Sequence, residues 1–379
     1  MRIAFISLMG GMPWGGSEVL WSKTARLALD EGHHVFISVY DWGSKNPQQV
    51  LELKEKGALV HFRKKWNPDE SILKKLKRRL GTRWNRFSKN WNPLVRFKPD
   101  MAFISQGDNF DLVIHHKELY NILIKNNINY SLICHGHAQY SHFLEYDQFV
   151  LAREIFNKSN IVYFVSNRQK DLTERKLAMK LSNSSITWNP LNLKDYNYIP
   201  WPSYETIQMA IVGSLVSGKG HDTLFEVLSD KNWQERDYLL NIYGKGDGEA
   251  YLKELCKFYC LEHKVNFMGN VSSATEIWEN NHILLIPSSG EGLPISLVEA
   301  AICGRPAVVT DVGGNREIII NGLTGFIADA PSVYSYSVAL ENAWKNIEKW
   351  EELGMKNRNL NINTINVEPE TEILNFLKL

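Results

Sequence analysis

Two glutamates, Glu291 and Glu299, stand eight positions apart where a glycine-rich loop runs into an apolar helix pattern. Pro294 suits the first turn of a helix, so we expect Glu291 in the loop and Glu299 in the helix. Carboxylates accept hydrogen bonds in pairs, and sugar hydroxyls occur in neighbouring pairs. The two carboxylates could therefore hold two ends of one hydroxylated ligand, although two ordinary surface glutamates would give the same spacing.

Lys219 is a second candidate, in the loop Gly-Ser-Leu-Val-Ser-Gly-Lys-Gly at residues 213–220. The loop follows a predicted strand and ends at a predicted helix start, where free N–H groups and the positive end of the helix dipole attract anions. A lysine is unfavourable beside that dipole unless an anion lies there too. The loop lacks the spacing of a P-loop, yet it predicts a site for a diphosphate.

Two further loops are rich in glycine, which lets a backbone approach a ligand closely. Gly15 and Gly16 follow the first predicted strand, and Ser17 is expected to cap the next helix. Gly246 lies in Tyr-Gly-Lys-Gly-Asp-Gly, residues 243–248. Each loop is also compatible with a plain turn.

Short apolar runs alternate with helix-length segments along most of the chain, which predicts parallel sheets covered by helices on both faces. The expected strands are 3–8, 35–40, 59–62, 101–105, 131–134, 161–165, 208–213, 238–243, 265–268, 282–286 and 306–310. The expected helices are 17–31, 47–56, 112–126, 147–158, 167–179, 220–229, 249–261, 294–303 and 315–321.

The alternation of strands and helices stops at a proline-rich stretch, residues 189–203. We interpret this stretch as a linker between domains. The predicted domains are 1–195 and 205–350, with a helical tail, 351–379, that packs back toward the first domain. Ligands of open α/β sheets bind beyond the carboxyl ends of the strands. All the loops above follow strands, so we expect the two Rossmann-like, doubly wound domains to face each other across a cleft.

The composition of the 379 residues, 44% hydrophobic and 22% charged, is that of a soluble globular protein. No apolar run reaches the roughly 18 residues of a spanning helix. Four cysteines fit reduced thiols in a cytoplasmic protein rather than a disulfide scaffold. The histidines lack metal-ligand spacing and no carboxylate pair accompanies them, so no metal site is predicted.

One segment, residues 61–98, carries thirteen Lys or Arg against Asp69 and Glu70, while the whole chain has a net charge of +1. Trp66, Trp84 and Trp91 are interleaved with these cations. We interpret this basic insertion as a surface for an anionic membrane. A solvated face over an ordinary core, or a surface for nucleic acid, would share the composition, and we predict no nucleic-acid partner.

Residues 287–326 resemble the family 4 retaining glycosyltransferases of the GT-B fold. The resemblance lies in the sequence EGLPISLVEAAICGRPAVVTDVGGNREIIINGLTGF, residues 291–326. The family's hallmark, two glutamates separated by seven residues, is matched by Glu291 and Glu299. The resemblance extends to the other glycine-rich loops. It covers most of the chain, with the basic insertion and the tail poorly matched.

The resemblance implies a role for each candidate. Lys219 would bind the donor diphosphate, Glu299 the ribose hydroxyls and Glu291 the hydroxyls of the transferred sugar. The catalytic set would comprise Lys219, Glu291 and His135. Gly15, Gly16 and Gly246 would lie near the donor, and backbone groups near Leu293 would contact phosphates and sugar.

A histidine at the end of a strand in the first domain usually lies near the sugar in this family, and His135 matches that place, with His137 as the alternative. Ser214 stands at a donor-binding position where the family often has a second phosphate-binding arginine. The diphosphate charge would then fall more on Lys219 and the helix dipoles, with Lys245 as a further candidate.

The activity implied is hexosyl transfer, with retention of configuration, from a UDP-sugar rather than a GDP-sugar to a hydroxyl of a glycolipid or polysaccharide. No cofactor or metal is expected, and the location implied is the cytoplasmic face of the plasma membrane. A sugar-nucleotide epimerase, a phosphorylase of the same architecture and an inactive protein that binds anionic ligands remain alternatives.

Overall fold

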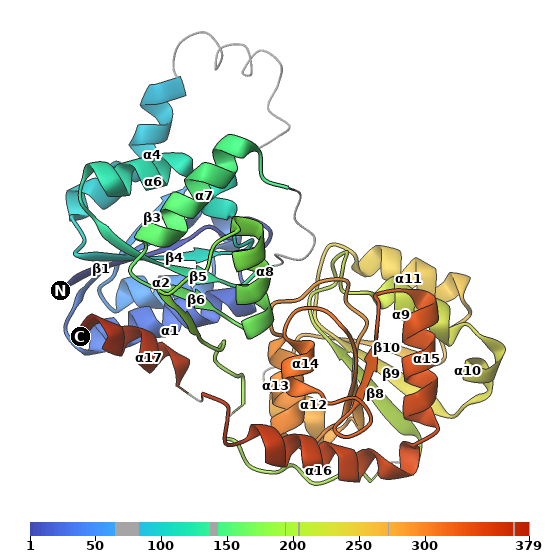
Figure 1. Cartoon of the computed structure of the whole chain (residues 1–379). Coiled ribbons are helices and arrows are strands. Elements are labelled where there is room, and N and C mark those ends of the chain that lie inside the picture. The colour runs from blue at the N-terminus through green and yellow to red at the C-terminus, as the bar shows by residue number, and fades with distance from the viewer. Residues whose placement is uncertain are drawn as a thin grey trace. The chain divides into compact units, whose positions relative to one another are not determined.

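The computed structural model describes residues 1–64, 83–136, 143–193, 195–203, 205–271, 273–366 and 368–378. The chain forms two compact units. The first comprises Met1–Pro190 together with Glu368–Leu379, and the second comprises Leu191–Val367. Each unit is an α/β structure with its own parallel sheet, as the alternation of strands and helices predicted (Figure 1).

The first unit has a seven-stranded sheet in the order β3-β2-β1-β4-β5-β6-β7. Its strands are β1 Arg2–Ser7, β2 His34–Tyr40, β3 Leu59–Arg63, β4 Met101–Gln106, β5 Asn129–Cys134, β6 Val162–Phe164 and β7 Ser184–Ile186. Its helices are α1 Gly16–Asp30, α2 Gln48–Glu55, α4 Arg83–Phe97, α5 Asp111–Ile114, α6 Lys117–Lys125, α7 Tyr146–Lys158, α8 Asn167–Leu177 and α17 Pro369–Asn375. The prediction missed β7 and expected one helix where α5 and α6 lie.

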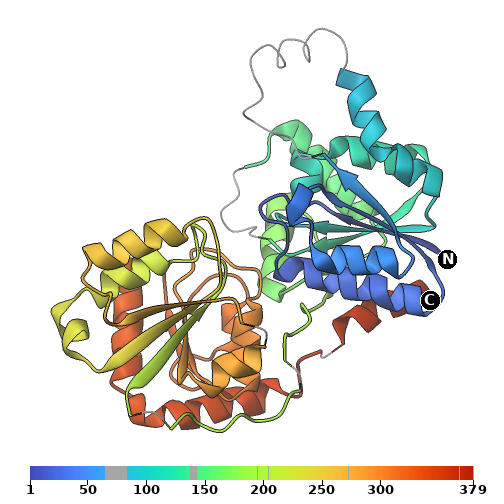
Figure 2. The same ribbon diagram turned by 180° about the vertical axis from the view of Figure 1, so that it is seen from behind.

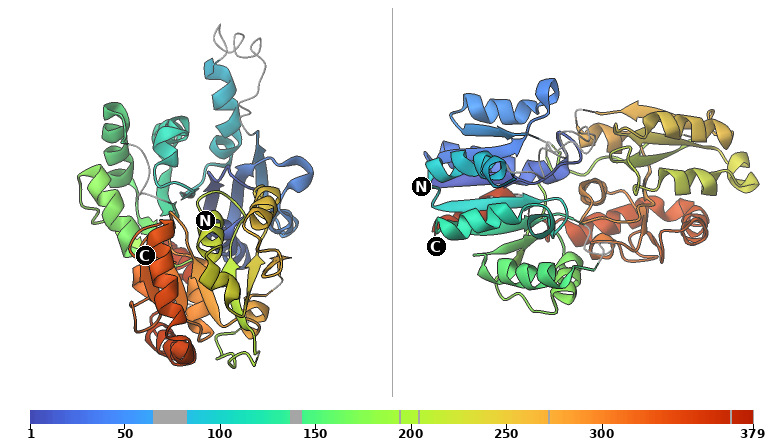
Figure 3. Two further views of the ribbon diagram at one scale, coloured as in Figure 1. Left: turned by 90° about the vertical axis from the view of Figure 1, so that its right-hand side faces the viewer. Right: turned by 90° about the horizontal axis from the view of Figure 1, so that it is seen from above.

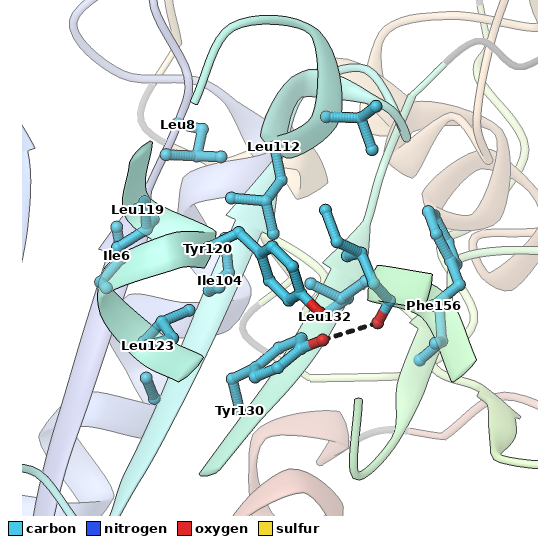
Figure 4. Close-up of a cluster of buried hydrophobic side chains, with 14 of the residues drawn as sticks. Ile6, Leu8, Ile104, Leu112, Leu119, Tyr120, Leu123, Tyr130, Leu132 and Phe156 are labelled. Carbon is cyan, nitrogen blue, oxygen red and sulfur yellow. Dashed lines mark hydrogen bonds between the residues drawn. The ribbon is translucent and has the colours of Figure 1, made fainter. Parts of the chain in front are cut away.

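Side chains alternate across this sheet, so its central strands contribute to two cores, one on each face. On β1, Ala4 and Ile6 join the core under α5, α6 and α7, whereas Ile3 and Phe5 join the core under α1 and α2. Figure 4 shows the first of these cores, where the Tyr130 hydroxyl donates to the Ile155 carbonyl oxygen at 2.7 Å. Because both faces are covered, the central strands β1 and β4 are rich in apolar residues.

The tail divides between the two units. Helix α16, Trp350–Asn361, belongs to the second unit, whereas α17 packs against α1 of the first (Figure 2). Ile373 and Leu374 of α17 are fully buried in the core that also contains Trp21. The end of the chain is therefore part of the first unit's core.

The second unit has a six-stranded sheet in the order β10-β9-β8-β11-β12-β13. Its strands are β8 Ile207–Val212, β9 Tyr238–Tyr243, β10 Val265–Gly269, β11 Ile283–Ile286, β12 Ala307–Thr310 and β13 Phe326–Ala328. Its helices are α9 His221–Leu228, α10 Lys231–Glu235, α11 Glu249–Phe258, α12 Ala274–Glu279, α13 Ile295–Ile302, α14 Asn315–Ile318, α15 Val333–Trp344 and α16. Helices α9, α11 and α15 cover one face, and α12 and α13 the other (Figures 1 and 3). The prediction missed β13.

Two arginines fix the proline-rich linker to the second unit. Arg305 is fully buried, and its guanidinium donates to the carbonyl oxygens of Ile199 at 3.1 Å and Pro200 at 2.7 Å. Arg358 donates to the Tyr196 carbonyl oxygen at 2.7 Å. Charged donors thus bind the carbonyl oxygens of this irregular segment and hold it on the second unit. In the described part of the chain, no helix is both long and apolar enough to cross a bilayer.

Candidate active site

Lys219 and Glu291 meet at the carboxyl edge of the second unit's sheet. Lys219 lies in the loop between β8 and α9, and Glu291 in the loop between β11 and α13. The Lys219 Nζ donates to Glu291 Oε1 at 2.8 Å and to Oε2 at 2.9 Å. The lysine side chain is 31% exposed and the glutamate side chain 8%. The two residues, 72 positions apart, form one largely buried ion pair.

The two loops that carry this pair are packed directly on each other. Gly220 has a φ of +74°, and a Cβ there would collide with the Pro287 carbonyl oxygen, so this position requires glycine. The backbone N–H of Ser289 donates to the Gly218 carbonyl oxygen at 2.9 Å. The backbone on either side of Lys219 therefore cannot shift without moving the Glu291 loop.

A third loop, after β12, supports Glu291 from its other side. Gly313 has a φ of +52°, and a Cβ there would collide with the backbone oxygens of Glu291 and Gly292. The Thr310 hydroxyl donates to the Ser288 carbonyl oxygen at 2.5 Å. The support of Glu291 by Gly313 and Thr310 was not predicted, although the Gly-Gly pair at 313–314 lies in the run that resembles the glycosyltransferases.

Glu299 lies in α13, as predicted, and is only 4% exposed. Its Oε1 accepts the backbone N–H of Asn192 at 2.7 Å. Burial raises the pKa of this carboxyl to about 7, against the opposing effect of the Asn192 hydrogen bond. A carboxyl with a pKa near neutrality, held on a short helix beside the Glu291 loop, is poised to exchange its protonation state at physiological pH. Leu293 is buried in the turn before α13.

Two other predicted donor residues lie in loops after β8 and β9. Ser214 immediately follows Gly213, whose N–H bonds to the Tyr243 carbonyl oxygen at 2.9 Å. A Cβ at Gly246 would collide with the backbone of Leu215. Close packing inside the protein is therefore one sufficient reason for glycine at 246, and contact with a donor remains a prediction.

Gly15 and Gly16 lie in the first unit, at the start of α1. Gly15 is the N-cap, with extended backbone and a φ of −158°. The prediction of Ser17 as the cap is wrong, because the helix already includes Gly16 and Ser17. A Cβ at Gly15 would meet only the Met12 side chain, at 3.4 Å, so this loop leaves room beside the helix N-terminus.

His135 follows β5 in the first unit and is 9% exposed. Burial lowers its pKa to about 4, so the imidazole is neutral. Neither ring nitrogen has a hydrogen-bond partner in the described part of the structure. His137, the alternative, lies outside the described residues. Among the residues that the structure describes, no cluster of three His, Cys, Asp or Glu could hold a metal ion.

A second polar feature of the first unit was not predicted. A cavity of about 10 Å³ lies at the carboxyl ends of β1 and β2. Glu18, which lines it, accepts from Ser7 Oγ at 2.8 Å and from Trp21 Nε1 at 3.0 Å, and burial raises its pKa to about 7. A glutamate directly after the Gly-Gly-Ser loop was the available signal.

The first cation of the basic insertion, Arg63, does not lie on the surface. Arg63 is 2% exposed, and its guanidinium stacks on the rings of Tyr40 at 4.7 Å and Trp91 at 4.8 Å. Counting Arg63 among surface cations was therefore wrong, because aromatic stacking stabilises it in the interior. Of the other twelve cations of the insertion, six lie in residues 65–82, outside the described residues.

Comparisons with known proteins identify proteins to which this chain is similar in sequence and in fold. Residues 203–360 match the family model described as Glycosyl transferases group 1. An uncharacterized glycosyltransferase of Haemophilus influenzae is 28% identical over 195 residues, which cover 51% of this chain and 54% of that protein. One subunit of the human phosphatidylinositol N-acetylglucosaminyltransferase is 29% identical over 187 residues, covering 49% of this chain and 38% of that protein. The chain thus matches about half, or less, of the length of these curated relatives.

Similar solved structures extend over the whole chain. Anabaena HepE in complex with UDP has a TM-score of 0.75 at 15% identity, with 100% of both chains covered. Sucrose-phosphate synthase from Thermosynechococcus elongatus has a TM-score of 0.74 at 16% identity, with 100% of this chain and 98% of that chain covered. These similarities confirm the predicted GT-B fold class. In sequence, the chain is related to glycosyltransferases.

Proposed function

We propose that this protein is a retaining glycosyltransferase of family 4 that transfers a hexosyl group from a UDP-sugar to a hydroxyl group. One observation carries the proposal. The Lys219–Glu291 pair lies at the carboxyl edge of β8 and β11, in the unit that matches the glycosyl transferases group 1 model. A cation for phosphate and a carboxylate for hydroxyls are the two groups that a nucleotide sugar needs at its reacting end.

UDP is the favoured nucleotide. Similar solved structures carry UDP, and one carries UDP-glucose. Several relatives are named as N-acetylglucosaminyltransferases, and one is named for UDP-N-acetylglucosamine itself. Glu299 would hold the ribose hydroxyls, since its buried carboxylate has acceptor capacity beyond the Asn192 hydrogen bond.

Lys219 would stabilise the negative charge that grows on the diphosphate as the sugar–phosphate bond breaks. The free N–H groups at the start of α9, His221–Leu228, would add to this stabilisation. The acceptor oxygen bonds to the anomeric carbon on the face that the diphosphate leaves, and its proton passes to the departing phosphate oxygen. Retention follows because the new bond forms on the side of the broken one.

The proposal is tested with purified protein and a panel of UDP-sugars. We expect UDP-glucose or UDP-N-acetylglucosamine to be consumed, with UDP released in step with a new glycoside in the presence of a lipid or oligosaccharide acceptor. Release of UDP without any acceptor would reveal slow donor hydrolysis by the same site. Conversion of the nucleotide sugar to its epimer, or transfer to inorganic phosphate, would contradict the proposal.

We also propose a glycolipid or polysaccharide acceptor and peripheral binding at the cytoplasmic face of the plasma membrane. The charge of residues 61–98 supports this proposal, as does the name of the human relative, which refers to phosphatidylinositol. Vesicles that contain anionic lipid are expected to sediment the protein, and added salt to release it, because surface attraction is screened.

The matched variant for this experiment replaces Lys74 and Lys75 with glutamine. At about 1 kcal/mol per charge, its vesicle binding should fall at least tenfold. Both residues lie outside the described residues, so the experiment tests the positive charge of the segment and not a particular structure. Equal binding of the unmodified protein to neutral and anionic vesicles would contradict membrane attachment through this segment.

A further inference from the structure

The Lys219–Glu291 pair joins two groups that should each hold a different part of the donor. Lys219 is expected at the diphosphate and Glu291 at the sugar, yet here the Nζ bonds to both carboxylate oxygens, at 2.8 and 2.9 Å. The Glu291 side chain is 8% exposed, so little water replaces its cation if the pair opens. Each of the two side chains is therefore bonded to the other at the place where it would bind a part of the donor.

A diphosphate cannot simply add to this arrangement. A phosphate oxygen bonded to the same Nζ would lie close to the Glu291 carboxylate, and like charges repel strongly where water is largely excluded. The two anions therefore compete for Lys219. Relief requires that one of them moves away.

The backbone around the pair leaves only side-chain rotation for that movement. Gly313 fits under the Glu291 backbone with no space for a Cβ, and Gly220 packs in the same way against Pro287. Ser289 is bonded to the Gly218 carbonyl oxygen at 2.9 Å. Because the loops are fixed, the pair can open only by rotation of the Lys219 and Glu291 side chains.

We propose that the pair is a switch that couples recognition of the diphosphate to recognition of the sugar. The diphosphate takes Lys219 from Glu291, and the released carboxylate then accepts hydrogen bonds from hydroxyls of the donor sugar. This inference rests on the proposed function. It predicts that a nucleotide diphosphate without a sugar binds at a penalty, since it takes the cation from a buried carboxylate and brings no hydroxyl in exchange. Glu291 thereby disfavours the UDP product and favours the intact donor.

The experiment compares UDP and UDP-sugar binding by calorimetry in the unmodified protein and two variants. Glu291→Gln removes the charge and keeps an oxygen that can accept from Lys219, so the loop retains its fold. Its affinity for UDP is expected to rise about fivefold to tenfold, while its affinity for the UDP-sugar substrate stays level or falls. Asp222→Asn, in the first turn of α9, is the matched control, because it removes an exposed carboxylate near Lys219.

Three results would overturn the switch: unchanged or weaker UDP binding in Glu291→Gln, an equal rise in Asp222→Asn, or an equal rise for UDP and the UDP-sugar. If the unmodified protein turns over a UDP-sugar while any of these holds, the switch alone is wrong. If the unmodified protein neither binds UDP nor consumes any UDP-sugar, the proposed function fails and the switch with it. Thermal melting of both variants checks that each remains folded.

Discussion

Replacement of Lys219 by alanine is expected to slow sugar transfer roughly a hundredfold while the protein stays folded. Lys219 is a cation at the carboxyl edge of β8. In the family that the chain resembles, a nearby position often holds a second cation, and here that position is Ser214. Loss of about 3 kcal/mol of charge stabilisation on the leaving diphosphate corresponds to this factor. Rates of UDP release at saturating UDP-sugar measure it, and the loss should appear in kcat as well as in kcat/KM.

Two companion variants isolate the charge of Lys219 from its structural role. Alanine at 219 leaves the Glu291 carboxylate, 8% exposed, without its cation, which is costly in itself. The double variant with Glu291→Gln removes that cost, and it should remain slower than Glu291→Gln alone. Lys219→Arg should recover part of the rate because it restores a cation. A Lys219→Ala protein that turns over within about threefold of the unmodified protein would refute the role.

The strands were predictable because parallel strands covered on both faces are continuous apolar runs. The two that were missed show the limit of that signal. Strand β7, Ser184–Ile186, has two serines in three residues, and β13, Phe326–Ala328, is equally short. Such segments become strands because a neighbouring strand offers them backbone partners, which no local pattern records.

The single helix expected over residues 112–126 is two helices in the structure, again because of contacts that the local sequence does not show. The helix is interrupted at His115 and His116, between α5 and α6. The ring of His116 is hydrogen-bonded to the Tyr40 hydroxyl at 3.0 Å, a residue 76 positions away. A tertiary contact of this kind overrides helical periodicity, and sequence alone does not show it.

The sequence predicted the loops in which Lys219 and Glu291 lie, but not the contact between these two residues. Nothing in the sequence states that β8 and β11 are neighbours, and only that strand order brings Lys219 to Glu291. Arg63 illustrates the opposite case, since its place in a basic run predicted exposure and stacking on Tyr40 and Trp91 holds it inside. Strand order and aromatic contacts are properties of the fold, so they become visible only with it.

Glu299→Ala is expected to weaken binding of UDP roughly a hundredfold. The carboxylate should accept from both ribose hydroxyls, and two hydrogen bonds to a charged group contribute about 3 kcal/mol or more together. Calorimetry with UDP and with 2′-deoxy-UDP measures the effect. Removing the 2′-hydroxyl should cost affinity in the unmodified protein and nothing further in the variant. If both proteins lose the same affinity for the deoxy ligand, Glu299 does not hold that hydroxyl.

The pKa of Glu299 gives the same assignment a second, independent test. Burial raises this pKa to about 7, so the carboxyl gains its proton as the pH falls through neutrality. Protonation removes the charge and half of the acceptor capacity, so affinity for UDP-glucose should decrease from about pH 8 to about pH 6. UDP-glucose is the suitable ligand, because its diphosphate is esterified at both ends and does not titrate in that range. Glu299→Gln, which keeps an acceptor for the Asn192 N–H, should bind weakly at every pH and lose this slope. A slope that persists in Glu299→Gln would assign the titration to another group, such as Glu18 with its similarly raised pKa.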